Sequence, residues 1–305
     1  MNFNPTLPDL MEDERLDQIN EGLRLIQKKQ GLTFGTDAYL LAAFTRGGSR
    51  AKAVDLGSGT GIIPLLLCAS GKLPSVTAVE IQPEFAELIG RNAQLNGFED
   101  RIRVLCRDVR RLTAADVGGE VDVVCSNPPY LKSNAGKSNR AEEKEIARHE
   151  VCGDIHAFCA AASRLLKTKG KFFCVYRSER LVDLLDAMRS NRLEPKRMVM
   201  VHADQASPPC MVLVEAMKDA SPSLNVLPPL FLYTEQAAVG GTRMRTPEAA
   251  HIYNTCSFPD RERKIPTKAI KKEIKETCNE IIGERTRVWP CPADCWHCFG
   301  WQVHS

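Results

Sequence analysis

The sequence predicts an α/β fold in which a mostly parallel sheet of seven strands carries helices on both faces. Short apolar runs alternate with segments of helical periodicity, a glycine-rich turn joins the first strand to a helix, and polar residues follow several strands. Strands separated by helices pair in parallel, and the helices then cover both faces of the sheet. The predicted strands are 51–56, 76–81, 102–106, 121–125, 172–176, 197–202 and 211–217.

Local signals define the predicted helices, which are 38–44, 62–69, a segment from Pro83 to Gly97, 155–166 and a segment that begins at Ser178. Proline is favoured in a first helical turn, and glycine commonly ends a helix. Ser178 is expected to cap its helix, whose leucines recur at the spacing of one buried face.

Composition is that of an ordinary globular protein, with 43% hydrophobic and 26% charged residues and a net charge of +3. The first residues lack a basic start followed by an apolar stretch, so we expect no signal peptide and a cytoplasmic location. The most apolar helix, 62–69, is too short to cross a bilayer. Cys106, Cys125 and Cys174 fall in apolar strands, where we expect buried thiols and no disulfides.

Three segments differ in pattern. The strand and helix alternation occupies 51–254, which we interpret as the main domain. Residues 1–50 precede it, and we expect them to pack over the ligand site. Residues 255–305 form an extension of unknown role, and the oligomeric state is not predicted by any pattern.

The turn after the first strand is the first candidate binding element. It reads Asp55-Leu56-Gly57-Ser58-Gly59-Thr60-Gly61. Glycines let the backbone turn sharply and approach a ligand, and the next helix presents free N–H groups. The spacing differs by one residue from the dinucleotide fingerprint, so the loop alone fits NAD as well as other nucleoside ligands.

Polar residues also end later strands. Glu80 is placed to accept hydrogen bonds from ribose hydroxyls, and Asp108 could accept one from an adenine amino group. Asp55 suits a ligand that carries positive charge or donors. Because the carboxyl ends of parallel strands meet at one edge, these residues and Asn127 are expected at one crevice.

The second candidate element follows the fourth strand and reads Asn127-Pro128-Pro129-Tyr130. The prolines restrict the backbone and remove two N–H donors. The Asn127 side-chain oxygen and the Pro128 carbonyl could then accept from one planar amino group, and Tyr130 could stack on its ring. On its own, however, such a segment is also a common proline-rich turn.

Together these residues resemble the class I, Rossmann-like methyltransferases that use S-adenosylmethionine. The resemblance implies a cofactor site at Asp55, Gly57, Ser58, Gly59, Gly61, Glu80, Asp108 and Asn127. The Asn-Pro-Pro-Tyr segment is similar to the motif of enzymes that methylate exocyclic or amide nitrogen. That similarity implies catalytic roles for Asn127, Pro128, Pro129 and Tyr130.

Further segments are similar to bacterial tRNA adenine-N6 methyltransferases, which modify the adenosine beside the anticodon of a valine tRNA. They are 32–38, 147–150, 177–181 and 193–197, and the resemblance covers roughly residues 15–254. It implies a tRNA substrate and a segment that closes over the methionine end of the cofactor through Thr36 and Asp37.

Basic side chains offer phosphate contacts. Candidates are Lys132, Lys137, Arg140, Lys144 and Arg148 after the second element, and Arg24, Lys28 and Lys29 before the first. Glutamates are interleaved with these basic residues, so a solvated charged surface without RNA contacts is an equally good interpretation.

Two alternatives stay open. A protein-glutamine methyltransferase of the release-factor type would use the same motif on a side-chain amide. Those enzymes carry an additional N-terminal helical domain, for which the fifty residues before Asp55 leave little room. The second alternative is a non-catalytic RNA-binding module that has kept the fold.

The C-terminal extension holds Cys278, Cys291, Cys295 and Cys298. Their spacing matches no common zinc finger, and the similarity of the last three to an iron–sulfur motif is poor because that motif sits early in its proteins. We therefore expect no metal, with these four cysteines as the alternative ligands.

Overall fold

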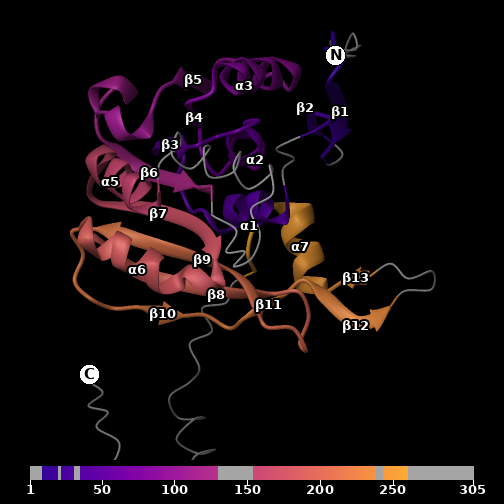
Figure 1. Ribbon diagram of the computed structural model, residues 1–305, viewed down its shortest axis with the longest axis vertical. Helices are drawn as coiled ribbons and strands as arrows, with labels where there is room; N and C mark the ends of the chain where they lie inside the picture. Colours follow the sequence, from indigo (N-terminus) through magenta and orange to yellow (C-terminus); the bar gives the residue numbers. More distant parts are fainter. Residues whose placement is uncertain (1–8, 20–21, 31–34, 130–153, 238–242, 260–305) are drawn as a thin grey trace, which may run out of the picture. The chain divides into compact units, whose positions relative to one another are not determined.

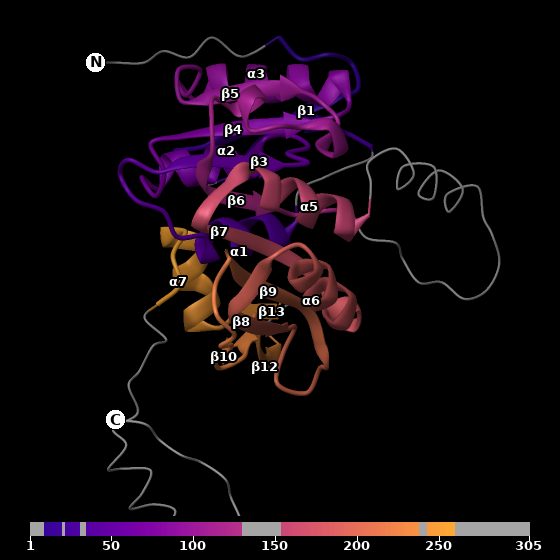
Figure 2. The same ribbon diagram turned by 90° about the vertical axis from the view of Figure 1, so that its left-hand side faces the viewer.

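The computed structural model describes residues 9–19, 22–30, 35–129, 154–237 and 243–259. Its centre is a nine-stranded sheet in the order β10-β8-β9-β7-β6-β3-β4-β5, with β11 beside β8. The strands are β3 (Lys52–Leu56), β4 (Ser75–Glu80), β5 (Ile102–Cys106), β6 (Val121–Ser126), β7 (Leu166–Arg177), β8 (Leu193–His202), β9 (Pro209–Lys218), β10 (Asn225–Val226) and β11 (Leu230–Phe231). Figure 1 and Figure 2 show this succession of strands.

The predicted mostly parallel sheet is confirmed. All seven expected strands are present, and only β9 is antiparallel, to both β7 and β8. The sequence missed the two short strands β10 and β11, which extend the sheet beside β8. Two-residue strands carry too little periodic pattern to be recognised.

Helices lie on both faces of the sheet (Figure 1). One layer contains α1 (Thr36–Phe44), α2 (Ile62–Ala69) and α3 (Pro83–Leu95), and the other contains α5 (Ile155–Leu165) and α6 (Leu181–Ser190). Two short 3₁₀ turns, η1 (Val109–Arg111) and η2 (Ala115–Val117), lie on the same face of the sheet as α5. A third, η3 (Ser178–Arg180), precedes α6. No helix in these described segments is both long and apolar enough for a membrane span.

Alternate strand residues build two cores. Ala53, Val123 and Cys125 belong to the cluster under α1 and α2, whereas Val54 and Val124 belong to the cluster under α5 and α6. Successive side chains of a strand point to opposite faces, so a strand covered on both sides is apolar throughout. This explains why the apolar runs of the sequence located the strands well.

The segment before residue 51 holds a hairpin that the sequence did not predict. Strand β1 (Glu14–Gln18) pairs antiparallel with β2 (Arg24–Lys28), and β2 packs on α3. Both strands are rich in charged residues, and the alternation is too short to stand out. The Arg91 guanidinium bonds both Glu14 carboxylate oxygens, at 2.7 and 2.9 Å, and so ties the hairpin to α3.

The chain after the sheet forms a second small hairpin and a helix. Strand β12 (Tyr233–Ala237) pairs with β13 (Arg243–Arg245), and α7 (Pro247–Thr255) packs against α1. The described residues up to 259 belong to one compact unit. The boundaries at 50/51 and 254/255 therefore stay predictions.

Two local expectations were wrong. Ser178 does not cap α6, because its hydroxyl donates to the Pro209 carbonyl and the helix begins at Leu181 after a 3₁₀ turn. Cys106 is exposed, whereas Cys125 and Cys174 are buried as expected. Cys106 is the last residue of β5, which is the edge strand of the sheet.

Candidate functional site

The sheet brings the two candidate elements together. Strand β3 lies between β6 and β4, and Leu56 is the register partner of both Ser126 and Val79. The chain runs from β3 to β4 and β5 on one side and returns to β6 on the other. Such a reversal is where ligands bind in open α/β sheets. Both the glycine loop and Asn127 therefore leave the sheet at its switch point, on adjacent strands.

The three glycines of the loop have different neighbours. All have positive φ, at 73° for Gly57, 54° for Gly59 and 82° for Gly61. An added Cβ would lie 3.2 Å from the Phe158 ring at Gly57 and 3.0 Å from Ile89 at Gly61. At Gly59 no described atom would come within 4 Å. Gly57 and Gly61 thus permit close packing, and Gly59 leaves room for a ligand against the backbone.

Glu80 holds this loop in place. Its carboxylate accepts the Gly59 N–H at 2.9 Å through Oε2, and the Ile81 and Gln82 N–H groups at 3.0 Å through Oε1. The side chain belongs to a buried residue at the end of β4. A carboxylate oxygen has two lone pairs, so Oε2 keeps capacity for a ribose hydroxyl. The predicted role in binding ribose stays a prediction.

Asp55 is fully buried at the end of β3. Burial raises its pKa to about 7, with Glu80 adding to the rise and the Ser58 and Cys125 side chains opposing it. The Cys125 thiol donates to Oδ1 at 3.5 Å, whereas Oδ2 has no hydrogen-bond partner among the described residues. A buried unpartnered carboxylate oxygen is costly, and a ligand donor or cation would relieve that cost.

Asp108 follows β5, where the sequence placed it, but its carboxylate is already engaged. Arg110 donates from its backbone N–H and its Nε at 2.9 Å, and Nη2 lies 2.6 Å from Oδ2. These bonds hold the pKa of Asp108 below its usual value. The predicted bond to an adenine amino group would have to share this carboxylate with Arg110.

Asn127 directly follows β6, and its amide is divided between two environments. Nδ2 donates to Asp37 Oδ2 at 2.8 Å. Oδ1 is buried and has no hydrogen-bond partner among the residues that the structure describes. An amide oxygen in this state is a ready acceptor for a ligand N–H. Pro128 is buried and Pro129 half-buried, whereas Tyr130 lies outside the described residues.

Thr36 and Asp37 begin α1 beside Asn127. The Asp37 Oδ1 atom accepts the Ala38 N–H at 2.9 Å, and the Thr36 side chain is hydrogen-bonded to Tyr253 of α7. A carboxylate at a helix N-terminus is favoured by the helix dipole. The structure therefore brings Asp37 to the switch point, together with Asn127 and the glycine loop.

One positioning residue was missed. Asn92 of α3 is fully buried, and its Nδ2 donates to the Thr60 and Ile26 carbonyls, each at 2.9 Å, while Oδ1 accepts the Ile26 N–H at 2.7 Å. It joins the glycine loop to β2. The available signal was a polar residue at helical spacing from Phe85, Leu88 and Ile89, on an apolar face.

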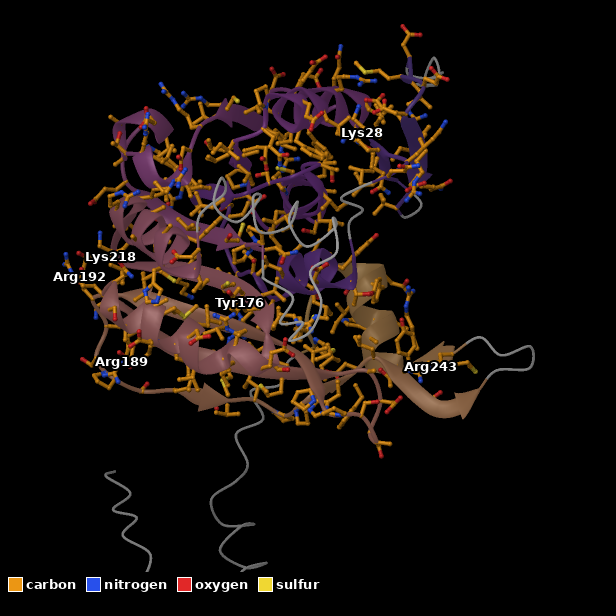
Figure 3. All side chains as sticks on the ribbon, in the orientation of Figure 1. Lys28, Tyr176, Arg189, Arg192, Lys218 and Arg243 are labelled. Atoms are coloured by element: carbon orange, nitrogen blue, oxygen red, sulfur yellow. The ribbon has the colours of Figure 1, made fainter. Side chains whose placement is uncertain are left out.

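Of the three basic residues predicted before the loop, Lys28 and Lys29 are bonded within the N-terminal segment, and Arg24 contributes its backbone N–H and carbonyl to the Asn96 side chain. Lys28 pairs with Asp13 at 2.9 Å, and Lys29 donates to the Glu12 carbonyl at 2.8 Å. Lys218, at the end of β9, and Arg192, just before β8, are labelled in Figure 3. Because β9 runs antiparallel to β7 and β8, these two residues lie at the amino ends of the parallel strands, whereas Asn127 follows the carboxyl end of β6. The predicted contacts at 132–148 lie outside the described residues.

No three His, Cys, Asp or Glu side chains of the described segments come together as a set of metal ligands. The four cysteines from Cys278 to Cys298 lie outside those segments.

The strand order and the glycine loop at the switch point are those of a Rossmann-like fold, and the family match makes the chain an S-adenosylmethionine-dependent methyltransferase. The same fold is found in the crystal structure of a predicted O-methyltransferase, protein Atu636 from Agrobacterium tumefaciens. Its TM-score is 0.58 at 23% identity, and the match covers 73% of this chain and 98% of that one. The chain belongs to the methyltransferase small domain family, whose model matches residues 29–190.

Curated relatives agree with this family. The chain is 30% identical over 186 residues to the tRNA1(Val) (adenine(37)-N6)-methyltransferase of Bacteroides fragilis, a match that covers 61% of this chain and 77% of that protein. It is also 30% identical over 187 residues to the protein of the same name in Porphyromonas gingivalis, covering 59% and 72%. The resemblance drawn from the sequence is confirmed at the level of the family.

The residues present fit S-adenosylmethionine, which is the cofactor of this class. The open space at Gly59 admits a ligand to the loop backbone. The unpartnered Asp55 Oδ2 calls for a donor or a positive charge, and this cofactor carries both an ammonium group and a sulfonium group. Glu80 would hold the ribose end. The assignment of individual cofactor contacts stays a prediction.

Proposed function

We propose that the protein methylates the exocyclic N6 amino group of an adenine in tRNA, namely the adenosine beside the anticodon of a valine tRNA. The relatives from Bacteroides fragilis and Porphyromonas gingivalis, named as tRNA1(Val) (adenine(37)-N6)-methyltransferases, support this substrate. The observation that carries the reaction type is the buried Asn127 Oδ1, an acceptor without a partner in the described part of the chain.

The chemistry follows from what this acceptor does to an amino group. When bound, S-adenosylmethionine supplies an electrophilic methyl group on a sulfonium sulfur. Asn127 Oδ1 and the Pro128 carbonyl would accept the two N–H groups of the adenine amine and draw electron density onto nitrogen. These hydrogen bonds strengthen as positive charge develops on nitrogen, so they lower the barrier rather than only binding substrate.

No protein base is required for this reaction. The nitrogen–carbon bond forms as the sulfur–carbon bond breaks, and the methylated nitrogen then releases one proton to water. The role of the chain is to hold the amine in line with the methyl group, which is a large part of the rate enhancement in such transfers. Tyr130 is proposed to stack on the adenine once it is rotated out of the RNA.

The test uses the full chain with labelled S-adenosylmethionine and offers either bulk tRNA or a purified release factor. We expect label in tRNA, and nucleoside mass spectrometry of that tRNA should show N6-methyladenosine. The Asn127→Ala variant is the matched control and should transfer label about 10²- to 10³-fold more slowly. tRNA from cells with and without the gene should differ in the same nucleoside at the valine anticodon loop.

Label on a glutamine of the release factor instead would favour the protein-glutamine alternative, because the same acceptors can hold a side-chain amide. Binding of tRNA without transfer to either substrate would favour the non-catalytic RNA-binding module. We place the protein in the cytoplasm with its tRNA substrate.

A further inference from the structure

The contact between Asp37 and Asn127 joins two residues that are 90 positions apart in the chain. Asp37 lies in the first turn of α1, and Asn127 follows β6. Neither side chain needs the other to fold its own element. Their hydrogen bond of 2.8 Å therefore belongs to the assembled site rather than to either local structure.

This bond determines which way the Asn127 amide points. The Asp37 Oδ2 atom accepts this hydrogen bond, so the Asn127 amide turns its NH₂ group toward Asp37. The opposite orientation would set the amide oxygen against the carboxylate, and two acceptors would repel each other. The amide oxygen is consequently directed away from Asp37, where it lacks a partner among the described residues.

The Asp37 carboxylate is itself held. Its Oδ1 atom accepts the Ala38 N–H at 2.9 Å. This contact lies at the N-terminus of α1, where the helix dipole favours negative charge. Gly35 makes room for it, because an added Cβ at that position would lie 2.8 Å from Oδ1. The adjacent Thr36 is bonded to Tyr253, whose ring also lies 4.9 Å from that of Tyr39 in α1.

We propose that Asp37 is a positioning residue that fixes the Asn127 amide with its oxygen as the acceptor for the target amine. This role rests on the proposed function and differs from the cofactor contact that the resemblance implied for Asp37. It acts on the methyl-transfer step, because an amide free to rotate would present its NH₂ group to the substrate amine for part of the time. Binding of the cofactor does not depend on it.

The experiment compares Asp37→Ala, Asp37→Asn and Asn127→Ala in the full chain. Methyl transfer to tRNA is measured under single-turnover conditions, and binding of S-adenosylhomocysteine is measured by calorimetry. Loss of a preorganised hydrogen-bonding group typically costs about 10²- to 10³-fold in rate, so loss of its orientation alone should cost Asp37→Ala roughly 10- to 100-fold. The dissociation constant of S-adenosylhomocysteine should stay within about twofold.

Two further comparisons separate positioning from a general structural effect. Asp37→Asn keeps one oxygen that can accept from Asn127, but its NH₂ group must then face the Ala38 N–H, so it should recover part of the lost rate. Asp37→Ala should cause no additional loss in an Asn127→Ala background, because a residue that acts only through Asn127 has nothing left to orient. Asp186→Ala, which removes an exposed carboxylate from α6, is the control and should behave as the parent chain.

Gly35→Ala provides a variant that displaces the carboxylate without removing it. We expect a loss of transfer rate of about 3- to 10-fold, smaller than that of Asp37→Ala, with unchanged S-adenosylhomocysteine binding. It keeps the proposal testable should Asp37→Ala fail to fold, which the far-ultraviolet circular dichroism spectrum would reveal.

The proposal is overturned by an unchanged rate in the folded Asp37→Ala variant, by weakened S-adenosylhomocysteine binding as its main defect, or by losses that add in the double variant. In each case tRNA methylation by the parent chain and its loss in Asn127→Ala would remain, so the proposed function would stand. If the parent chain labels no tRNA, the proposed function fails first. The orienting role can then be read from labelling of whichever substrate is methylated.

Discussion

Two pairs of neighbouring strands end near the switch point, and the polar residues at their ends differ in whether they have hydrogen-bond partners within the protein. At β3 and β6, Asp55 Oδ2 and Asn127 Oδ1 have no hydrogen-bond partner among the described residues. At β4 and β5, Glu80 accepts three backbone N–H groups and Asp108 is paired with Arg110. Each residue of the first pair keeps one oxygen without a hydrogen-bond partner in the described part of the chain, whereas the second pair already stabilises loops of the protein.

This difference shows that polar residues at the ends of similar strands can have different roles, because some lack partners in the protein and others stabilise its loops. All four lie at or just after the carboxyl ends of apolar strands, and the sequence assigned all four to ligand binding. Polar atoms that are buried without a partner raise the free energy of the ligand-free protein. Their retention at β3 and β6 is therefore the stronger indication of a binding role.

The prediction with the largest expected effect concerns Asp55. Its pKa is raised by burial to about 7, above the usual value of 3.8, so the folded state binds its proton more tightly than the unfolded state does. Its stabilising contribution is complete below pH 4 and is lost as the pH rises through about 7. Three pH units correspond to roughly 4 kcal/mol in the free energy of unfolding.

Asp55→Asn should therefore flatten the dependence of unfolding free energy on pH between about 4 and 7 in the cofactor-free protein, as measured by urea denaturation. Binding of S-adenosylhomocysteine near pH 7 should release a proton from the parent chain but not from this variant. Equal pH dependence in the two proteins would contradict the assignment of the buried charge to Asp55.

The second test removes the other open acceptor. Asn127→Ala should lower the single-turnover rate of methyl transfer by about 10²- to 10³-fold, because the amine loses a hydrogen bond that strengthens in the transition state. S-adenosylhomocysteine binding should change by less than about threefold. If the variant loses cofactor affinity and keeps its rate, the role of Asn127 is in cofactor binding rather than in catalysis.

The third test concerns Glu80, whose carboxylate already accepts hydrogen bonds from the backbone. Glu80→Gln keeps the shape of the side chain, but its NH₂ group must face either the Gly59 N–H or the N–H groups of Ile81 and Gln82. A buried N–H left without an acceptor costs about 1 to 3 kcal/mol, so unfolding by urea should show a loss of about that size. An unchanged midpoint would show that Glu80 does not hold the loop.

The smallest effect is expected at Asp108. Asp108→Ala removes an N-cap of η1 and a partly exposed pair with Arg110, and such caps contribute about 0.5 to 1 kcal/mol. If Arg110 occupies this carboxylate in the bound state as well, S-adenosylhomocysteine affinity should fall by less than about tenfold. A larger loss of affinity in calorimetry would place Asp108 with the open pair and weaken the comparison.

Segments that are buried along their length were the ones predicted best from the sequence. Helix 62–69 was predicted with its observed bounds, because it is apolar and buried along nearly its whole length. The hairpin at 14–28 and helix α7 were missed, since their stability comes from packing on α3 and α1. The Ser178 cap was wrong because a tertiary contact with Pro209 took its hydroxyl.

By itself the sequence determined the order of the seven main strands and of the five helices that cover them, the glycine turn and the Asn-Pro-Pro-Tyr segment, because each depends on residues a few positions apart. Only the tertiary structure decided which polar atoms lack partners, how far the Asp55 pKa is raised, and that Asp37 meets Asn127. Those properties arise from burial and from contacts between distant segments, and no local pattern contains them.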